Sequence, residues 1–281
     1  MNKLIADCGS TKIDWALCDA EGRTEMFNSP GVNPVLLNEE EIDKSFAQAL
    51  AFQTTGKEQI KEVYFYGAGC VGEHALTVEK ALRNNLPSAS IFVYSDLLGA
   101  ARALLKNEEG IACILGTGSN SCLFDGQQIQ KNIPPLGFIL GDEGSGAALG
   151  KMLLNAIYKQ RTGDTLRSAF EEETRLTLPD VLRHVYRSEM PSRFLASLVP
   201  FASRHIADDT IRQAVTDNFR RFFSCNIAPY GRRDLPASFV GGMAATFGKQ
   251  LREVAESEGY TVRTILAKPI DGLISFHCAE R

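Results

Sequence analysis

The sequence lacks the markers of several protein classes. Its seven cysteines include no C-x-x-C pair, and its four histidines are scattered without the spacing of metal ligands. Such usage argues against a disulfide framework or a zinc site and predicts reduced thiols in a cytoplasmic protein. The chain meets a charge at Asp7 after three apolar residues, which is not a signal-peptide core. No stretch approaches the roughly 18 uncharged apolar residues of a membrane span, so we expect no membrane partner.

Positive charge is also in short supply. The 30 lysines and arginines are outnumbered by 34 aspartates and glutamates, which gives a formal net charge of −4. Nucleic acid is therefore not an expected partner, because phosphate backbones are bound by basic surfaces. What is present is an ordinary globular composition, 44% hydrophobic and 23% charged, in 281 residues. That length is enough for about two domains.

Apolar periodicity in the N-terminal part predicts alternating strands and helices. Strands are expected at residues 3–6, 13–17, 63–66 and 91–94, with one more after the turn at 20–22, and helices at 39–52, at 73–84 and from about 96. The first helix should bury one face, formed by Ile42, Phe46, Ala49 and Leu50. This alternation indicates an α/β domain with a largely parallel sheet.

The same plan restarts further along the chain. Strands are expected at 111–115, 122–124 and 127–131, followed by a mainly helical stretch at 144–227, a strand at 237–240, a helix through 256, a strand at 261–265 and a helix at 269–278. At an offset of 109 residues, Gly9-Ser10 falls on Gly118-Ser119, and Trp15 falls on Phe124. We interpret the two segments as copies of one unit. The predicted domains are 1–107 and 108–281, the second ending in a helix at 269–281 that returns to the first.

Three glycine-rich turns each follow an apolar strand. They are Asp7-Cys8-Gly9-Ser10-Thr11, Gly116-Thr117-Gly118-Ser119 and Gly241-Gly242-Met243-Ala244. Glycine lets backbone N–H groups approach an anion closely, and hydroxyls add further donors. One such turn is most often a plain hairpin or helix start. Three of them, two at matching positions of a repeat, predict a phosphate chain held from two domains.

These turns resemble the nucleotide motifs of the superfamily that unites sugar kinases, heat-shock ATPases and actin. Asp7-x-Gly9-x-Thr11 is similar to its first phosphate loop, Leu115-Gly116-Thr117-Gly118-Ser119-Asn120 to its second, and Phe239-Val240-Gly241-Gly242-Met243-Ala244 to its adenosine motif. Ser95-Asp96 before a helix and Gly141-Asp142-Glu143-Gly144-Ser145-Gly146 resemble the N-acetylglucosamine kinase branch, which is grouped with the BadF/BadG-type ATPases. The resemblance runs in order from Asp7 to about Gly272.

The resemblance implies an α/β fold of two ribonuclease-H-like domains, as in actin-like ATPases, with a cleft between them for ATP and a sugar. It implies an ATP-dependent kinase that phosphorylates a hydroxyl, expected to be the 6-hydroxyl, of an amino sugar or N-acyl amino sugar such as N-acetylglucosamine. ATP and Mg²⁺ would be the cofactors and a small-molecule sugar the partner. A homodimer is the base-rate expectation for its assembly.

The resemblance also implies roles for individual residues. Asp96 would be the general base that takes the proton of the sugar hydroxyl, which needs a carboxylate within about 3 Å of it. Asp7 would position Mg²⁺ through water, because this ion keeps several of its waters. Asn33 and Asp142, together with Asp96, would hydrogen-bond the sugar hydroxyls. The nucleotide contacts would be Gly9, Ser10, Thr11, Gly116, Thr117, Gly118, Gly241 and Gly242.

Each of these acidic and amide residues also has a structural interpretation. Asp96 could be a helix N-cap, and Asp7 could be a turn residue that caps its own loop. Asn33, which precedes a proline, could be a simple turn residue. Asp142-Glu143 could be acidic residues that favour a helix N-terminus, and we interpret Glu143 as structural.

The acyl group of the substrate stays open. N-acetylglucosamine kinases typically carry a Gly-Trp pair before the Gly-Asp-Glu-Gly segment, and that pair frames the acetamido group. This chain has Pro135-Leu136 there. The alternatives are therefore a plain amino sugar, a different N-acyl sugar, or a larger relative such as a muramic acid.

Three functions are alternatives to a sugar kinase. A BadF/BadG-type activator drives electron transfer through an iron–sulfur cluster between subunits, but the cysteines lack a clustered spacing. Gly67-x-Gly69-x-x-Gly72 after a strand, with Asp96 24 positions beyond, has the form of an NAD-dependent dehydrogenase motif. That interpretation leaves the other three glycine turns unexplained. An ATP-dependent sensor is the third alternative, although no DNA-binding extension is visible.

Overall fold

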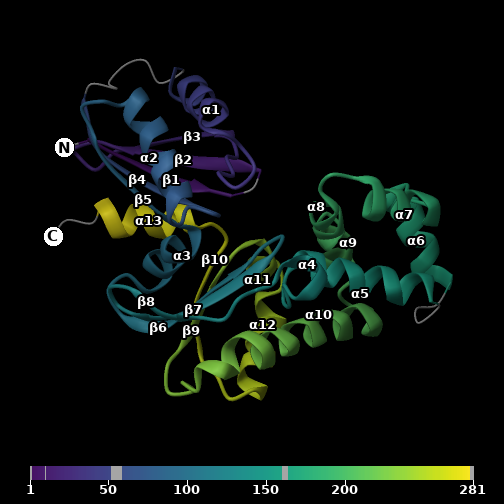
Figure 1. Cartoon of the computed structure of the whole chain (residues 1–281). Coiled ribbons are helices and arrows are strands. Elements are labelled where there is room, and N and C mark those ends of the chain that lie inside the picture. Colours follow the sequence, from purple (N-terminus) through teal and green to yellow (C-terminus); the bar gives the residue numbers. More distant parts are fainter. Residues whose placement is uncertain (1, 10, 52–58, 160–163, 279–281) are drawn as a thin grey trace. The chain divides into compact units, whose positions relative to one another are not determined.

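The computed structural model describes residues 2–9, 11–51, 59–159 and 164–278 (Figure 1). The chain divides into two compact units. Unit 1 comprises Met1–Asn107 and Lys268–Arg281, and unit 2 comprises Glu108–Ala267. Each unit is built on one five-stranded sheet.

The sheet of unit 1 has the order β3-β2-β1-β4-β5. Its strands are β1 (Asn2–Cys8), β2 (Lys12–Cys18), β3 (Thr24–Pro30), β4 (Ile60–Gly67) and β5 (Ser90–Ser95). The first three strands pair antiparallel, whereas β4 pairs parallel with both β1 and β5. The sheet is therefore mixed, not largely parallel as expected, because short turns join the first three strands into a meander.

Helices cover both faces of this sheet. Side chains of α1 (Glu39–Ala51) and α2 (Glu73–Asn85) pack with Leu4, Ala6 and Phe65 on one face. The predicted apolar face of α1 is buried, as expected from its periodicity. On the other face, α3 (Asp96–Leu105) and α13 (Pro269–Cys278) pack with Ile5 and Tyr66. The alternation of Leu4, Ile5 and Ala6 between the two cores follows from the period of two in a strand.

Unit 2 repeats the strand order of unit 1, as β8-β7-β6-β9-β10. The strands are β6 (Glu109–Leu115), β7 (Ser119–Asp125), β8 (Ile129–Asn132), β9 (Ala237–Val240) and β10 (Val262–Leu266). This confirms the α/β fold class and the repeat. The offset of 109 is wrong, however, because β1 and β6 begin at residues 2 and 109, which is 107 apart.

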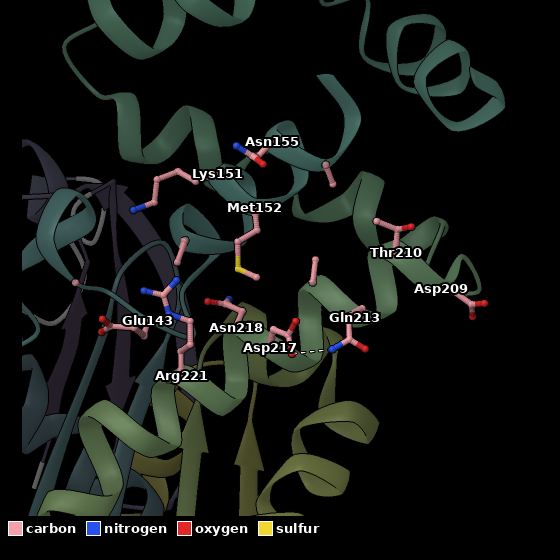
Figure 2. A pocket seen from close by; sticks show the side chains of 14 residues that line it. Glu143, Lys151, Met152, Asn155, Asp209, Thr210, Gln213, Asp217, Asn218 and Arg221 are labelled. Atoms are coloured by element: carbon pink, nitrogen blue, oxygen red, sulfur yellow. Dashed lines mark hydrogen bonds between the residues drawn. The ribbon is translucent and has the colours of Figure 1, made fainter. Parts of the chain in front are cut away.

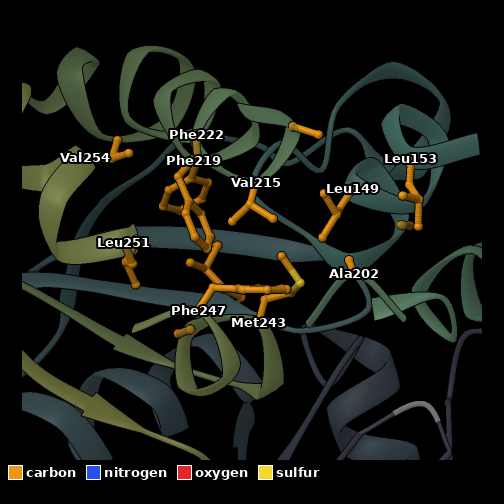
Figure 3. Close-up of a cluster of buried hydrophobic side chains, with 14 of the residues drawn as sticks. Leu149, Leu153, Ala202, Val215, Phe219, Phe222, Met243, Phe247, Leu251 and Val254 are labelled. Carbon is orange, nitrogen blue, oxygen red and sulfur yellow. The ribbon is translucent and has the colours of Figure 1, made fainter. Parts of the chain in front are cut away.

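A helical segment separates β8 from β9. Its helices are α4 (Gly137–Leu140), α5 (Gly146–Tyr158), α6 (Asp164–Thr174), α7 (Leu178–Arg187), α8 (Pro191–Ala196), α9 (Val199–Arg204) and α10 (Asp209–Phe222), followed by a π-helical turn at Phe223–Ile227 and a 3₁₀ turn at Ala228–Tyr230. Figure 3 shows side chains of α5 and α10 meeting those of α11 (Gly242–Thr246) and α12 (Gly248–Ser257) in one core. Phe219 and Phe222 of α10 are fully buried there.

The helix expected from Gly242 to residue 256 is two helices. They are α11 (Gly242–Thr246) and α12 (Gly248–Ser257), and the chain leaves helical geometry at Phe247. The Phe247 side chain is buried in the core of unit 2, so tertiary packing overrides the local helical pattern. Among the described helices, none has the length and apolar composition needed to cross a bilayer.

Candidate active site

Burial and two neighbouring aspartates raise the pKa of a third aspartate at one end of the sheet of unit 1. Asp7 lies near the end of β1, and Asp14 is its direct partner on β2. Asp96 is the first residue of α3, immediately after β5. Burial, and then the negative charges of Asp14 and Asp96, raise the pKa of Asp7 to about 7, while Lys12 lowers it. A carboxyl with so high a pKa is one that a nearby cation would stabilise in its charged form.

Asp96 is not the N-cap of its helix. Ser95 fills that position, and its hydroxyl accepts a hydrogen bond from the Leu98 N–H at 3.3 Å. Asp96 instead accepts from the Leu97 N–H at 2.9 Å through Oδ1. Burial raises the pKa of the Asp96 carboxyl. The capping alternative is therefore wrong, and the elevated pKa suits a proton acceptor.

Asp14 was not among the predicted site residues. It is 5% exposed, and its Oδ1 accepts hydrogen bonds from Lys12 Nζ at 2.9 Å and from Asn28 Nδ2 at 2.5 Å. Lys12 has an exposed side chain that forms an ion pair with Asp14. The sequence did contain a signal for Asp14, because it is a charged residue among the apolar residues of a strand. A carboxylate buried in such a strand needs a partner.

The predicted sugar residue Asn33 lies in a tight turn of unit 1. Its Oδ1 accepts from the Val35 N–H at 3.0 Å, and its carbonyl oxygen accepts from Leu36 and Leu37. Among the described residues, no hydrogen bond uses the Asn33 side-chain NH₂, which is therefore available as a donor. A Cβ on Gly69 would come within 3.2 Å of Asn33 Oδ1, so the two turns are in close contact.

This contact explains part of the Gly67-x-Gly69-x-x-Gly72 pattern. Gly69 has a φ of +76° and packs beneath the Asn33 turn, while a Cβ on Gly67 would collide with the Cys70 sulfur at 2.7 Å. Gly72 has a φ of +55° at the start of α2. Backbone conformation and close packing thus account for these glycines without a dinucleotide.

The predicted first phosphate loop is the hairpin between β1 and β2. Gly9 donates its N–H to the Lys12 carbonyl at 3.0 Å, and both Gly9 and Thr11 are exposed. Ser10 lies outside the described residues. The neighbouring Cys8 is buried, and burial raises the pKa of its thiol to about 12, so it is a packing residue.

The predicted second phosphate loop joins β6 to β7 in unit 2 and is hydrogen-bonded to the start of α5. Gly146 donates its N–H to the Gly116 carbonyl at 2.8 Å, and Ala147 donates to the Thr117 carbonyl at 3.1 Å. These bonds satisfy helix N–H groups that would otherwise lack partners. They also fix the loop while leaving the Thr117 side chain exposed.

Asp142 lies against this second loop. Its Oδ1 accepts from the Ser119 N–H at 3.4 Å, and its Oδ2 is 3.0 Å from where a Cβ on Gly118 would stand. Asp142 has a φ of +54°, a left-handed conformation that is unfavourable for a residue other than glycine. Burial raises the pKa of its carboxyl. A conformation of this kind, held by its surroundings, is typical of functional loops.

Gly241 completes the group in unit 2. A Cβ at this position would lie 2.3 Å from the Leu115 carbonyl oxygen, and its φ is +123°. The end of β6, where the second loop begins, therefore requires glycine here. Gly242 begins α11 with open space around its Cα. The structure thus gathers the predicted residues into two groups, one in each unit.

A cavity of about 620 Å³ in unit 2 was not predicted from the sequence (Figure 2). It lies between α5 and α10, and Gly141 and Glu143, the neighbours of Asp142, form part of its wall. Glu143 also accepts a hydrogen bond from Asn226 Nδ2 at 3.2 Å. Polar groups predominate among the other lining side chains, which include Lys151, Asn155, Gln213, Asp217 and Arg221.

The whole chain is similar to known proteins. A model of the BadF/BadG/BcrA/BcrD ATPase family matches residues 6–275. A candidate N-acetylglucosamine kinase from Porphyromonas gingivalis is 42% identical, has a TM-score of 0.94, and covers 98% of each chain. A candidate N-acetylglucosamine kinase from Chromobacterium violaceum is 17% identical with a TM-score of 0.69 and 98% of both chains covered, and at that identity it shows the fold alone. No curated protein matches the chain.

Proposed function

Because the chain belongs to the BadF/BadG/BcrA/BcrD ATPase family, we propose that it is an ATP-dependent kinase for an amino sugar or N-acyl amino sugar. The observation that carries the proposal is the likeness to the Porphyromonas gingivalis protein, which extends over nearly the whole of both chains. The 6-hydroxyl is the proposed acceptor. Phosphoryl transfer needs the reactants to be positioned and their charge to be neutralised, and residues of both units supply groups for these two tasks.

In unit 1 we assign the acid–base chemistry. Asp96 accepts the proton of the attacking sugar hydroxyl, and its raised pKa makes this transfer more favourable than an ordinary carboxylate would. Asn33 donates its free side-chain NH₂ to a sugar oxygen. Asp7 fits Mg²⁺, because burial and then the negative charges of Asp14 and Asp96 raise its pKa to about 7, a cost that a bound cation would offset, and because this ion takes carboxylate and phosphate oxygens. Bound Mg²⁺ would neutralise charge on the phosphates.

In unit 2 we assign phosphate and sugar contacts. The exposed hydroxyl of Thr117 and the backbone of its loop face the phosphates, and Gly241 leaves room for that loop at the end of β6. Asp142 accepts hydrogen bonds from sugar hydroxyls. The cysteines are all unpaired, which is typical of the cytoplasm, where we place the protein. A homodimer is the proposed assembly, which light scattering can test.

The test is ADP release with purified protein and Mg·ATP. The acceptors to compare are glucose, glucosamine, N-acetylglucosamine, N-acetylmannosamine and N-acetylmuramic acid, with the 6-deoxy form of the best acceptor as a control. We expect at least one amino sugar to stimulate ADP release and its 6-deoxy form not to do so. ATP hydrolysis that no sugar changes would reject the kinase. Activity on the 6-deoxy sugar would reject the acceptor position.

A further inference from the structure

Asn218, on α10, joins its side chain to the loop that carries Asp142. The residue is 1% exposed. Its Oδ1 accepts a hydrogen bond from the Gly144 N–H at 2.9 Å, and its Nδ2 donates to the Ser145 carbonyl at 3.0 Å. One amide thus binds two consecutive residues of the loop. Both bonds lie in buried surroundings, where an unmade hydrogen bond would be costly.

The loop needs such an external partner because its own backbone is unfavourable. Asp142 adopts a left-handed conformation, which costs on the order of 1–3 kcal/mol for a residue other than glycine. Within the loop, the Ser145 N–H donates to the Asp142 carbonyl at 3.1 Å. Gly144, with a φ of +79°, lies so close to α10 that a Cβ would be 2.8 Å from Phe222 Cβ. The loop is therefore seated directly on α10.

The two hydrogen bonds act two and three residues away from Asp142. Ser145 is also the N-cap of α5, where its hydroxyl accepts from the Ala148 N–H at 3.0 Å. Asn218 thus fixes the point at which the loop becomes a helix. With α5 fixed on one side and α10 beneath, the Asp142 carboxylate is directed at the Ser119 N–H. Asn218 and Glu143 both line the cavity of Figure 2.

We propose that Asn218 is a positioning residue that holds the Asp142 carboxylate in place for the sugar. This inference rests on the proposed function, because it takes Asp142 as a sugar contact. Asn218 itself touches neither the sugar nor the phosphates. It acts through the Gly144-Ser145 backbone, and its loss frees the loop to leave the strained conformation.

Two substitutions at Asn218 and one matched control test the proposal. Asn218→Leu keeps the branched shape and removes both hydrogen bonds. Asn218→Asp keeps an acceptor for Gly144 and places an oxygen against the Ser145 carbonyl. Phe219→Leu is the control, because Phe219 is the next residue of α10, is fully buried, and belongs to the hydrophobic core of unit 2. It reports the effect of a generally weakened α10.

The readouts are the KM for the sugar, the KM for ATP, and hydrogen exchange of the peptide covering residues 141–147. We expect both Asn218 variants to raise the sugar KM at least tenfold while the ATP KM changes less than threefold. We expect faster exchange in residues 141–147 in the Asn218 variants and not in Phe219→Leu. An unchanged sugar KM in a folded Asn218 variant would overturn the proposal, as would equal effects of Phe219→Leu.

Hydrogen exchange also separates this proposal from the proposed function. If the wild-type protein phosphorylates no sugar, the kinase is rejected. Faster exchange in residues 141–147 of the Asn218 variants alone would then still support a role in holding the Asp142 loop. Unchanged exchange would reject that role as well.

Discussion

Replacing Asp7 by Asn should make the protein more stable at neutral pH, although it removes the proposed Mg²⁺ ligand. The pKa of Asp7 is raised from 3.8 to about 7, so the folded state binds this proton where the unfolded state has lost it. Stability therefore falls as the pH rises from about 4 to about 7 and stays low above that range. At 1.36 kcal/mol per pKa unit, the full cost at pH 8 is about 4 kcal/mol. Solvent around the partly exposed carboxylate reduces this, so we expect a gain of about 1 to 4 kcal/mol from Asp7→Asn.

Thermal unfolding in chelator-treated buffer at several values between pH 5 and pH 8.5 measures this effect. The Tm of Asp7→Asn should exceed that of the wild type by at least about 2 °C at pH 8. The difference should grow between pH 5 and pH 7 and then level off. Mg²⁺ should narrow it, because the ion stabilises only the charged wild-type side chain.

Asp19→Asn is the matched control. Asp19 is in the turn after β2, and hydrogen bonds from Arg23 and Glu21 lower the pKa of its carboxyl. Its replacement should therefore give no stabilisation that grows with pH. A Tm difference for Asp7→Asn that does not depend on pH, or a lower Tm at pH 8, would refute the electrostatic account of Asp7.

Three further predictions concern the proposed site. Asp96→Asn should change the sugar affinity measured by calorimetry by less than about threefold. It should lower kcat by about 10²-fold or more, as expected for loss of a general base, and a near-normal kcat would remove Asp96 from the chemistry. Gly241→Ala should lower the Tm and raise the KM for ATP, because its Cβ would stand 2.3 Å from a carbonyl oxygen of β6. Gly231→Ala, which has a φ of +70° and open space, is the control with backbone strain alone; equal effects on ATP would contradict a role for Gly241. Asp14→Asn should lower the pKa of Asp7 and move the acid limb of the pH–rate profile to lower pH, and a shift to higher pH would contradict this coupling.

Local signals in the sequence were sufficient for most of the fold. The apolar spacing of α1 and the positions of the strands depend on near neighbours, and both are found in the structure, whereas the sheet of unit 1 is mixed and not largely parallel as expected. The break at Phe247 could not be predicted this way, because it depends on a core assembled from distant helices. The positions of glycines and aromatic residues indicate the repeat. The sequence offset between its two copies, however, depends on how the strands pair, and the sequence of a single strand does not reveal its pairing.

For the candidate site, the motifs identified residues but not their surroundings. Asp96 and Asp142 stand in recognisable patterns, whereas Asp14 acts through its cross-strand position opposite Asp7. The left-handed backbone of Asp142 and its support by Asn218 are tertiary features. The cavity between α5 and α10 is also a product of packing, since residues far apart in the chain form its walls.

The docking of α13 has a consequence for synthesis of the protein. Ile270 and Leu273 are buried with residues of β1, β2 and α3, and a Cβ on Gly272 would be 2.4 Å from the Ala103 carbonyl oxygen. The part of this face that α13 covers therefore stays exposed on the ribosome until the second unit has been translated, whereas α3 is made earlier and can already pack on the rest. Nascent chains that end before α13 should expose the apolar side chains that α13 covers, and we expect chaperones to retain these chains.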